Sequence, residues 1–416
     1  MKRFGLLCIA AGFAATVDIA TRTSAATDWI STVESIPSPA GRDAAQPQLA
    51  AEGDRLLVSW IERSGDRATL KFADRTTTGW SEPRTVVTGA DFFVNWADVP
   101  SVVRLADGSL AAHWLQKSAA STYAYDVRLV FSVDDGRTWS APASPHHDGT
   151  QSEHGFASLF QVPRAGLGLV WLDGRAMTEM KPGDHEGMSR GAMSVRGGVF
   201  DRNGVQLSET LVDDRVCECC PTAAAVTSDG PIVAFRNRTE DEVRDIYVSR
   251  LVDGAWSEPV PVHRDNWHIA ACPVNGPALS ANGRTVVIAW FTATGDQGHV
   301  FAAFSNDAGK TFRPPVRIDD VGALGRVDVE LLPDESAVVS WIEFADQRSQ
   351  FRIRRVERSG SRSASTSVAG ISASRASGYP RLARHGHEIV FAWTDTNDGS
   401  HVRTAIARLA GAGTRE

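Results

Sequence analysis

Four cysteines follow the apolar N-terminal stretch, and three of them fall within four residues. They are Cys217, Cys219, Cys220 and Cys272. Because disulfides are common in exported proteins, pairing of these thiols is one interpretation. A bond between the adjacent Cys219 and Cys220 would be strained, so Cys217–Cys220 together with Cys219–Cys272 is one possible set. Four cysteines allow three pairings, and the sequence does not choose among them.

The same cysteines could instead hold a metal ion. Three thiolates fall within four residues, and His154 and His268 are further candidate ligands. Soft sulfur ligands of this kind suit zinc or copper(I). Both interpretations require Cys272 to lie beside the other three cysteines in the fold, although it follows Cys220 by 52 residues.

The elements that must position these side chains are short strands. Residues 272–314 contain strand-like runs at Gly276–Leu279, Thr285–Trp290 and Val300–Ser305, and a fourth run follows the tight turn Asp307–Gly309. Nothing in this stretch has the period of a helix. Four short antiparallel strands in about forty residues are typical of one blade of a β-propeller.

The same unit recurs along the chain. Its marker is an apolar run that ends in an aromatic residue, and the seven runs are Leu56–Trp60, Leu110–Trp114, Leu167–Trp171, Ile232–Phe235, Val286–Trp290, Val338–Trp341 and Ile389–Trp393. The aromatic residues recur every 51 to 64 residues. We therefore predict an all-β fold: a propeller of seven four-stranded antiparallel blades, in one domain that covers residues 26–416.

The two ends of the predicted domain complement each other. Trp29–Ile36 (WISTVESI) resembles the fourth strand of a blade, as does Trp80–Val87 (WSEPRTVV). The last repeat supplies only three strands before the chain reaches Leu409. We predict that the N-terminal strand 29–36 completes the last blade, because this pairing closes the ring and removes exposed sheet edges.

The N-terminus predicts export. Residues 1–25 contain the basic residues Lys2 and Arg3, an apolar stretch at Phe4–Ala15 and small residues before position 26, which is typical of a secretory signal peptide. No later run approaches 18 apolar residues, so we expect a secreted or periplasmic protein without a membrane span. The net charge of −7 and the lack of basic blocks argue against nucleic acid or anionic membrane as a partner. We expect a monomer.

Two predicted turns carry a sharper signature, S-x-D-x-G-x-T followed by an aromatic residue. The first contains Ser132, Asp134, Gly136, Thr138 and Trp139, and the second contains Ser305, Asp307, Gly309, Thr311 and Phe312. In such a turn the Asp can accept backbone N–H bonds, the Gly supplies a positive φ, and the aromatic ring fills the space beneath. We therefore expect these residues to be structural.

This signature resembles the Asp-box (BNR) repeats of the sialidase (neuraminidase) superfamily, and together with the repeat it covers nearly the whole predicted domain. Sialidases have six blades, which makes a six-bladed ring the alternative. The resemblance implies that the Asp-box turns lie on the face opposite the ligand site. The site face would then carry the loops that enter each blade, where Asp98, Glu153, His154, Arg326 and Tyr379 stand. Side chains from several blades would converge at the mouth of the central channel, as in a ligand site.

The resemblance also implies candidate catalytic residues. Sialidases hold the substrate carboxylate with three arginines, whose planar forks bind it with two bonds, and use a Tyr–Glu nucleophile pair with an Asp acid/base. The matching candidates are Asp98 as acid/base, Tyr379 as nucleophile and Arg175, Arg236 and Arg326 as carboxylate ligands. The chain departs from the family where the first arginine belongs to an R-I-P motif, because Ala45–Leu49 contains no arginine.

Two functions are therefore open. The first is an exported propeller that binds an extracellular glycan or another ligand at the channel mouth, with the cysteine cluster as disulfides or as a copper or zinc site at that face. The alternative is an exo-glycosidase of the sialidase type that acts on sialosides or related acidic sugars. The missing R-I-P arginine favours binding, whereas the gathering of Arg, Asp and Tyr keeps the alternative open.

Other histidines have simpler interpretations. His113 falls inside a predicted strand, and we expect it to be packed there. His146 falls in a predicted turn, and we expect it to be solvated.

Overall fold

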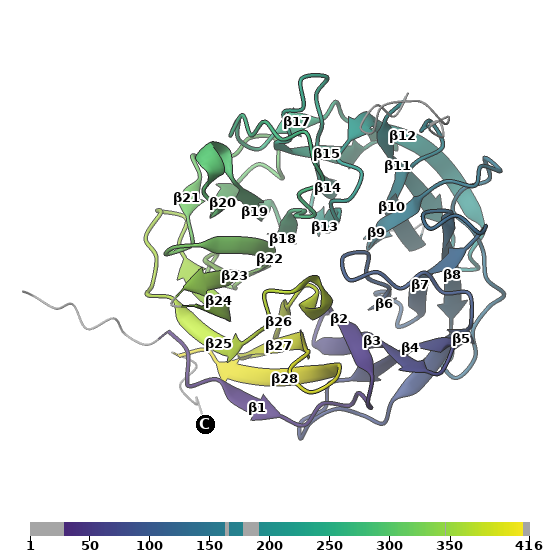
Figure 1. The fold of residues 1–416 in the computed structure, drawn as a ribbon, viewed down its shortest axis with the longest axis horizontal. Helices are drawn as coiled ribbons and strands as arrows, with labels where there is room; N and C mark the ends of the chain where they lie inside the picture. The colour runs from purple at the N-terminus through teal and green to yellow at the C-terminus, as the bar shows by residue number, and fades with distance from the viewer. Residues whose placement is uncertain (1–28, 163–165, 178–190, 346, 411–416) are drawn as a thin grey trace, which may run out of the picture.

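The computed structural model describes residues 29–162, 166–177, 191–345 and 347–410. The predicted signal peptide, residues 1–25, lies outside these ranges. Seven antiparallel sheets stand around a central axis, and each sheet is one blade (Figure 1). The predicted all-β, seven-bladed propeller is confirmed, and the six-bladed alternative is wrong.

Most blades consist of four strands that follow one another from the axis outward. Blade 1 contains β2 (Ala44–Glu52), β3 (Arg55–Ser64), β4 (Arg67–Asp74) and β5 (Arg84–Gly89). Blade 2 contains β6 (Ser101–Arg104), β7 (Leu110–Lys117) and β8 (Tyr125–Ser132), and the place of its fourth strand is taken by a single bridge between Leu129 and Ala143. Blade 3 contains β9 (His154–Val162), β10 (Gly166–Asp173), β11 (Met193–Phe200) and β12 (Gln206–Val216).

The second half of the ring repeats this order. Blade 4 contains β13 (Ala223–Thr227), β14 (Gly230–Arg236), β15 (Ile246–Val252) and the short β16 (Ala255–Trp256) and β17 (Val260–Pro261). Blade 5 contains β18 (Ala278–Asn282), β19 (Thr285–Thr292), β20 (His299–Ser305) and β21 (Val316–Arg317). Blade 6 contains β22 (Ala323–Leu331), β23 (Ala337–Ala345), β24 (Arg348–Val356) and β25 (Thr366–Gly370). Blade 7 contains β26 (Arg381–His385), β27 (Glu388–Asp395), β28 (His401–Arg408) and β1 (Glu34–Ile36).

The second strand of each blade is apolar because neighbouring sheets cover both of its faces. All eight side chains of β19, for example, are buried. The aromatic residue that ends each run is buried as well: Trp60, Phe235 and Trp393 are at most 7% exposed. The core is therefore distributed between blades. Trp60 of blade 1, for instance, shares a hydrophobic cluster with Val390 of blade 7.

The ring closes as predicted. Strand β1 pairs antiparallel with β28, with Ile36 opposite Thr404, and Ile30 forms a further bridge with Leu409. Trp29 and Ile30 are buried in the cluster between blades 6 and 7. The pairing is shorter than the predicted strand 29–36, because regular strand structure begins at Glu34.

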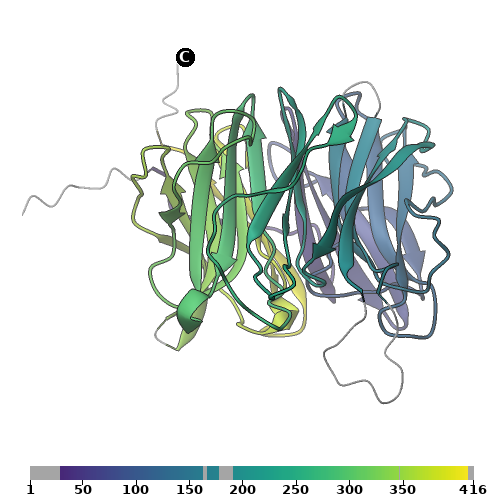
Figure 2. The same cartoon turned by 90° about the horizontal axis from the view of Figure 1, so that it is seen from above.

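The two faces of the ring differ in their turns. Strand β20 runs from His299 to Ser305, so the 3₁₀ turn η1 (Thr294–Asp296) before it and the Asp-box turn after it lie at opposite ends of blade 5. The second 3₁₀ turn, η2 (Arg375–Ser377), lies on the same face as η1 (Figure 2). We call this the site face. In the described ranges no helix is long and apolar enough to cross a membrane.

Candidate functional site

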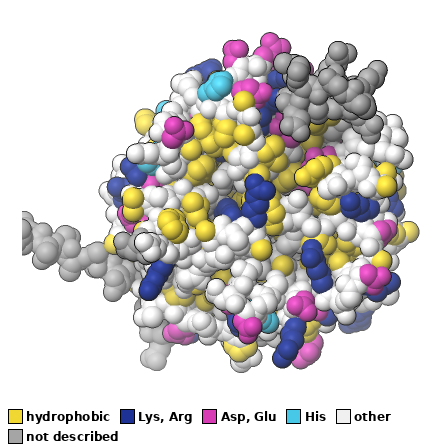
Figure 3. Space-filling model, in the orientation of Figure 1, with side chains coloured by type: hydrophobic (Ala, Val, Ile, Leu, Met, Phe, Trp, Pro, Cys, Tyr) yellow, Lys and Arg dark blue, Asp and Glu magenta, His cyan; other side chains and the backbone are white. Residues whose placement is uncertain are grey.

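The site face surrounds the mouth of a channel. A cavity of about 480 Å³ runs along the axis and is lined by the first strands of all seven blades. Arg and Lys side chains lie near the centre of the site face, among hydrophobic side chains (Figure 3). Deep in the channel, burial and the neighbouring Asp328 raise the pKa of Glu330 to about 8. The channel is thus a polar cavity that opens on the face where the predicted site residues gather.

One tyrosine joins two carboxyl groups at this mouth. The Tyr125 hydroxyl lies 2.9 Å from Asp98 Oδ2 and 2.7 Å from Glu153 Oε1. Asp98 Oδ1 accepts a further bond of 2.7 Å from the backbone N–H of Phe156. Asp98 and Tyr125 are fully buried, whereas Glu153 is partly exposed. Glu153 is therefore the most exposed member of this network.

The pKa values of both carboxyl groups are raised. Burial raises the pKa of Asp98 to about 8, and the hydrogen bonds from Tyr125 and Phe156 only partly oppose this shift. Burial also raises the pKa of Glu153 to about 7, with a contribution from the negative charge of Glu218. A carboxyl group with a pKa near neutrality can both donate and accept a proton at neutral pH.

Glu218 faces this network from the loop that enters blade 4. It forms ion pairs with Arg238 and with Arg244, the latter at 2.8 Å. Arg238 and Arg244 also pair with Glu242. Glu218 is thus a carboxylate fixed by two guanidinium groups, which is a different environment from that of Glu153.

The cysteine cluster restrains the turn that carries Glu218. Cys217 and Cys220 form a disulfide with their Cα atoms 5.7 Å apart. The second pair of the set considered above is absent, since Cys219 and Cys272 are free thiols. The two thiols nevertheless interact, and this interaction raises the pKa of Cys219 and lowers that of Cys272. The two cysteine loops therefore meet at the mouth.

The arrangement of sulfur atoms bears on the metal interpretation. The sulfur atoms of Cys217, Cys219 and Cys220 lie within 4.8 Å of one another, but two of them are bonded as a disulfide. His268 is exposed, and His154 belongs to another cluster, beside Asp126, Asp148 and Asp173. The ligand set of thiolates and histidines that the sequence suggests is not assembled in this arrangement.

Two of the candidate arginines have structural partners. Arg236 is buried and donates to the backbone oxygens of Asn275, Arg244 and Phe291 at 2.6 to 2.8 Å. Arg326 donates to Ser377 Oγ and to three backbone oxygens of the segment 373–378. Both meet Asn275, whose side-chain oxygen accepts the backbone N–H of Arg326 at 2.8 Å. Their guanidinium groups hold loops of the mouth together.

Tyr379 and Arg175 are similarly engaged. The Tyr379 hydroxyl is buried and donates to the backbone oxygen of Val274 at 2.7 Å, and burial raises its pKa. Its ring stacks on Trp96, with ring centroids 6.0 Å apart. Arg175 pairs with Asp173 at 2.7 Å and with Glu209 at 2.8 Å, in the cluster that contains His154.

Sequence reasoning missed the role of Tyr125. This residue begins the third strand of blade 2, where an alternating pattern suggests only packing, yet the start of a third strand lies on the site face. That position was the signal available in the sequence. The hydrogen bond between Tyr125 and Glu153 could not be predicted from the sequence, because it depends on how far blade 3 brings Glu153 toward blade 2.

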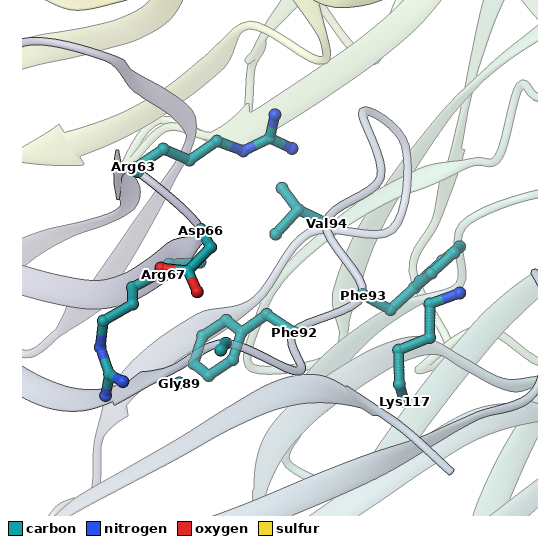
Figure 4. Close-up of a pocket in the computed structure, with 11 residues that line it drawn as sticks. Arg63, Asp66, Arg67, Gly89, Phe92, Phe93, Val94 and Lys117 are labelled. Atoms are coloured by element: carbon teal, nitrogen blue, oxygen red, sulfur yellow. The ribbon is translucent and has the colours of Figure 1, made fainter. Parts of the chain in front are cut away.

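A second cavity, of about 360 Å³, lies between blades 1 and 2 (Figure 4). Arg63 and Arg67 line one side of it, and Phe92 and Lys117 line the other. Phe92 stacks on Trp114 with ring centroids 6.1 Å apart. Its cationic and aromatic lining suits an anionic ligand, but the raised carboxyl pKa values are found at the mouth and in the channel instead.

Comparison with known proteins agrees with this architecture. A family model described as "BNR repeat-like domain" matches residues 54–386. No curated protein sequence matches the chain.

Several solved structures are similar in fold. A protein of unknown function from Dyadobacter fermentans is 13% identical with a TM-score of 0.53, over 92% of this chain and 100% of that one. The polysaccharide lyase Uly1 is 9% identical with a TM-score of 0.53, over 89% of this chain and 91% of that one. A K499G mutant of the NanB sialidase from Streptococcus pneumoniae is 10% identical with a TM-score of 0.47, over 85% of this chain and 83% of that one. At these identities the similarity shows the fold alone.

Proposed function

The chain belongs to the BNR repeat-like domain family, and from this premise we propose that it processes an extracellular glycan at the mouth of the central channel. Glu153 is the proposed proton donor. The observation that carries this role is its carboxyl group, which belongs to a partly exposed residue, is held by the Tyr125 hydroxyl at 2.7 Å and has a pKa raised by burial to about 7. The reaction class is glycoside hydrolysis.

The proposed chemistry needs two carboxyl groups in different environments. Protonated Glu153 donates its proton to the glycosidic oxygen as the bond to the sugar carbon breaks. The ion-paired carboxylate of Glu218 faces the positive charge that develops on the sugar and accepts a proton from the water that attacks the sugar carbon. Asp98 does not meet the ligand, because it is fully buried, and it acts by fixing Tyr125.

The mouth also suits an acidic sugar. Arg375 of η2 is exposed, and its guanidinium lies 5.9 Å from the ring centroid of Trp96. No carboxylate in the described residues forms an ion pair with it, so it is free to bind the carboxylate of a ligand. We include sialosides and related acidic sugars in the proposed substrate class for this reason.

The test is a comparison of wild type with Glu153→Gln on a panel of fluorogenic glycosides that includes a sialoside. Wild-type turnover that falls at least a hundredfold in Glu153→Gln, with ligand affinity retained, supports the proposed role. Tyr379→Phe is the matched control, since its hydroxyl hydrogen-bonds to backbone groups of Val274 and Gly276, and it should keep its turnover. Equal turnover by wild type and Glu153→Gln would refute the role of Glu153.

Binding without cleavage is the second candidate function. It is favoured by Arg236, Arg326 and Tyr379, whose polar groups are already engaged by protein oxygens. A glycan that binds the chain but is released unchanged, with affinity lowered by Arg375→Ala, would select this function over hydrolysis.

Export is part of the proposal. Its support is the basic and apolar pattern of residues 1–25. N-terminal sequencing of the protein from a periplasmic or secreted fraction tests it: a chain beginning near residue 26 supports export, and an intact Met1 in the cytoplasm refutes it.

A further inference from the structure

Two histidines and three aspartates form a compact cluster between blades 2 and 3. Asp126 belongs to β8, His146 and Asp148 belong to the connection between the blades, and His154 and Asp173 belong to β9 and β10. The imidazole rings of His146 and His154 stack with centroids 3.7 Å apart and planes 9° apart. Each end of the stacked pair therefore presents one nitrogen from each ring.

One end of this pair has the arrangement of a cation site. Asp126 Oδ1 lies 3.5 Å from His154 Nδ1 and 3.9 Å from His146 Nε2. The three atoms all lie within 4.8 Å of one another. In a tetrahedral zinc site with bonds of about 2.0 Å, ligand atoms lie about 3.3 Å apart. A small inward movement of these side chains would give that spacing.

The two ring nitrogens at this end lie near the Asp126 carboxylate but form no hydrogen bond in the part of the chain that the structure describes. Within the described ranges, neither His154 Nδ1 nor His146 Nε2 has a hydrogen bond. The side chain of His154 is fully buried and that of His146 is 6% exposed. A buried polar atom without a partner is costly, so its presence calls for a ligand that the protein itself does not supply.

The other end has the features of a supporting shell. Asp148 Oδ2 lies 3.2 Å from His154 Nε2 and 3.5 Å from His146 Nδ1. Asp173 Oδ1 lies 3.8 Å from His154 Nε2. Histidines that bind metals commonly face a carboxylate with their second nitrogen, which fixes the ring orientation. Arg175 pairs with both carboxylates on this side, so a cation would bind at the Asp126 end instead.

Charge in the cluster points the same way. Asp126, Asp148 and Asp173 are opposed by the single guanidinium of Arg175, whose remaining contact is to Glu209. Glu209 is balanced in turn by Arg196. When both imidazoles bind a metal and are therefore neutral, two negative charges are left over, which is the charge that one divalent cation neutralises.

We propose that Asp126, His146 and His154 bind a divalent transition-metal ion, and that Zn²⁺ is the ion that fits this donor set best. Two nitrogens and one carboxylate oxygen match the three protein ligands of many zinc sites, whereas Mg²⁺ and Ca²⁺ prefer oxygen ligands alone. The Asp126 side chain is 25% exposed, which gives the ion a path from solvent. This site is separate from the cysteine cluster and uses none of its sulfur atoms.

The experiment measures zinc binding to the full chain after removal of metal with a chelator. To exclude binding by thiols, it uses the Cys219→Ser/Cys272→Ser background. Isothermal titration with ZnCl₂ should give one ion per chain. His146→Ala should abolish this binding, and His147→Ala, which changes the exposed neighbour, should leave it unchanged. Co²⁺ bound in place of zinc should show visible bands without the intense near-ultraviolet absorption of thiolate ligands.

Further variants keep the test decisive if His146→Ala does not fold. Asp126→Asn is nearly isosteric and partly exposed, and it should also abolish binding. Asp148→Asn removes the charge behind both rings and should weaken zinc binding about 10–100-fold. The melting temperature should rise with zinc in the parent chain but not in Asp126→Asn. A parent chain that binds no zinc, or an Asp126→Asn chain with unchanged zinc affinity, overturns the proposal. Protons on the histidines would then balance the charge of the neighbouring aspartates.

Discussion

At the scale of residues, the partner of each polar atom separates a chemical role from a structural one. Tyr125 and Tyr379 are both buried, but the hydroxyl of Tyr125 meets two carboxyl groups and that of Tyr379 meets a backbone oxygen. Only the first arrangement changes the proton affinity of a group that a ligand can reach, namely Glu153. The proposed chemistry therefore belongs to Glu153 and not to the tyrosine beside the channel.

The pH dependence of turnover tests this assignment. Glu153 must be protonated to act as an acid, and its pKa is about 7. We expect kcat/KM to be highest below pH 7 and to fall about tenfold for each pH unit well above it. Measurement of kcat/KM from pH 5 to pH 9 checks this. A profile that rises through pH 7 would mean that Glu153 acts as a base.

Asp98→Asn should change how stability depends on pH. The pKa of Asp98 is raised in the folded state to about 8, so its contribution to stability is complete below the unfolded pKa, near 4, and is lost as the pH rises through about 8. We expect the wild-type melting temperature to drop by a few degrees more than that of Asp98→Asn between pH 5 and pH 8.5. Parallel declines in the two proteins, measured by circular dichroism melts in matched ionic strength, would count against the raised pKa.

Some residues of the candidate site could be placed correctly from the sequence, and others could not. Asp98 and Glu153 could be assigned to the mouth because they stand just before first strands. His113 is buried inside β7, as expected. The expectation that His146 is solvated is wrong, because the connection between blades 2 and 3 folds its ring against His154. Contacts between blades depend on loop paths, and a loop path has no periodic signature.

At the scale of elements, the Asp-box turns show how a local motif anchors a blade. Asp307 accepts bonds from the backbone and the hydroxyl of Thr311, at 2.9 and 2.7 Å, and from Ser305 Oγ at 2.7 Å. Gly309 has a φ of 79°, and a Cβ there would lie 2.1 Å from Ile232 Cδ1. Blade 5 is thereby packed against blade 4 through a position that admits only glycine.

Asp307→Ala should lower the free energy of unfolding by about 1–2 kcal/mol through loss of these hydrogen bonds. The bonds also lower the pKa of Asp307 to about 2 against the opposing effect of burial, so the contribution is present above about pH 4 and is lost as the pH falls toward 2. Urea denaturation at pH 7 and pH 3 measures both effects. Asn306→Ala, in the same turn but exposed, is the control and should have little effect.

The turn closed by the Cys217–Cys220 disulfide positions a side chain, whereas the Asp box anchors a blade. Cys217 and Cys220 bracket Glu218, so their bond limits where this carboxylate can lie. We expect Cys217→Ser/Cys220→Ser to lower the free energy of unfolding by about 2 kcal/mol and to lower turnover on glycans as Glu218 loses its position. Cys272→Ser is the control, since it leaves the disulfide intact. Unchanged turnover in the double variant would show that the bond does not position Glu218.

The sequence predicts the second strand of each blade better than it predicts whether the fourth strand is regular. The buried second strands, with their terminal aromatic residues, recur because two neighbouring sheets impose the same packing on each blade. The outer strands face solvent on one side and are less constrained. The fourth strand of blade 2 is accordingly reduced to the bridge between Leu129 and Ala143, and that of blade 4 is split into β16 and β17.

At the scale of the whole molecule, stability depends on a closed ring. Each hydrophobic cluster is shared by neighbouring blades, as that of Trp60 and Val390 shows for blades 1 and 7. No blade in the described ranges has a core of its own, so loss of one contact between blades exposes surface on two of them. The seven repeats in the sequence predict this ring, because each repeated apolar run packs between neighbouring blades.

Removal of residues 29–36 should therefore destabilise the whole ring. Strand β1 pairs with β28 through residues 34–36, and Trp29 and Ile30 pack in the cluster between blades 6 and 7. Burial of Ile30 alone contributes about 2 kcal/mol, and the deletion also exposes the edge of β28 for pairing with other chains. We expect a lower melting temperature and a new tendency to aggregate.

Calorimetry and light scattering on the deletion variant check these two effects. A synthetic peptide of residues 29–36 should restore the melting temperature when added in excess, because it can rebuild the fourth strand of blade 7, whereas a scrambled peptide of the same composition should not. The peptide separates loss of closure from general damage to the fold. A deletion variant that melts at the wild-type temperature would show that blade 7 is stable with three strands and that the ring does not depend on its N-terminal strand.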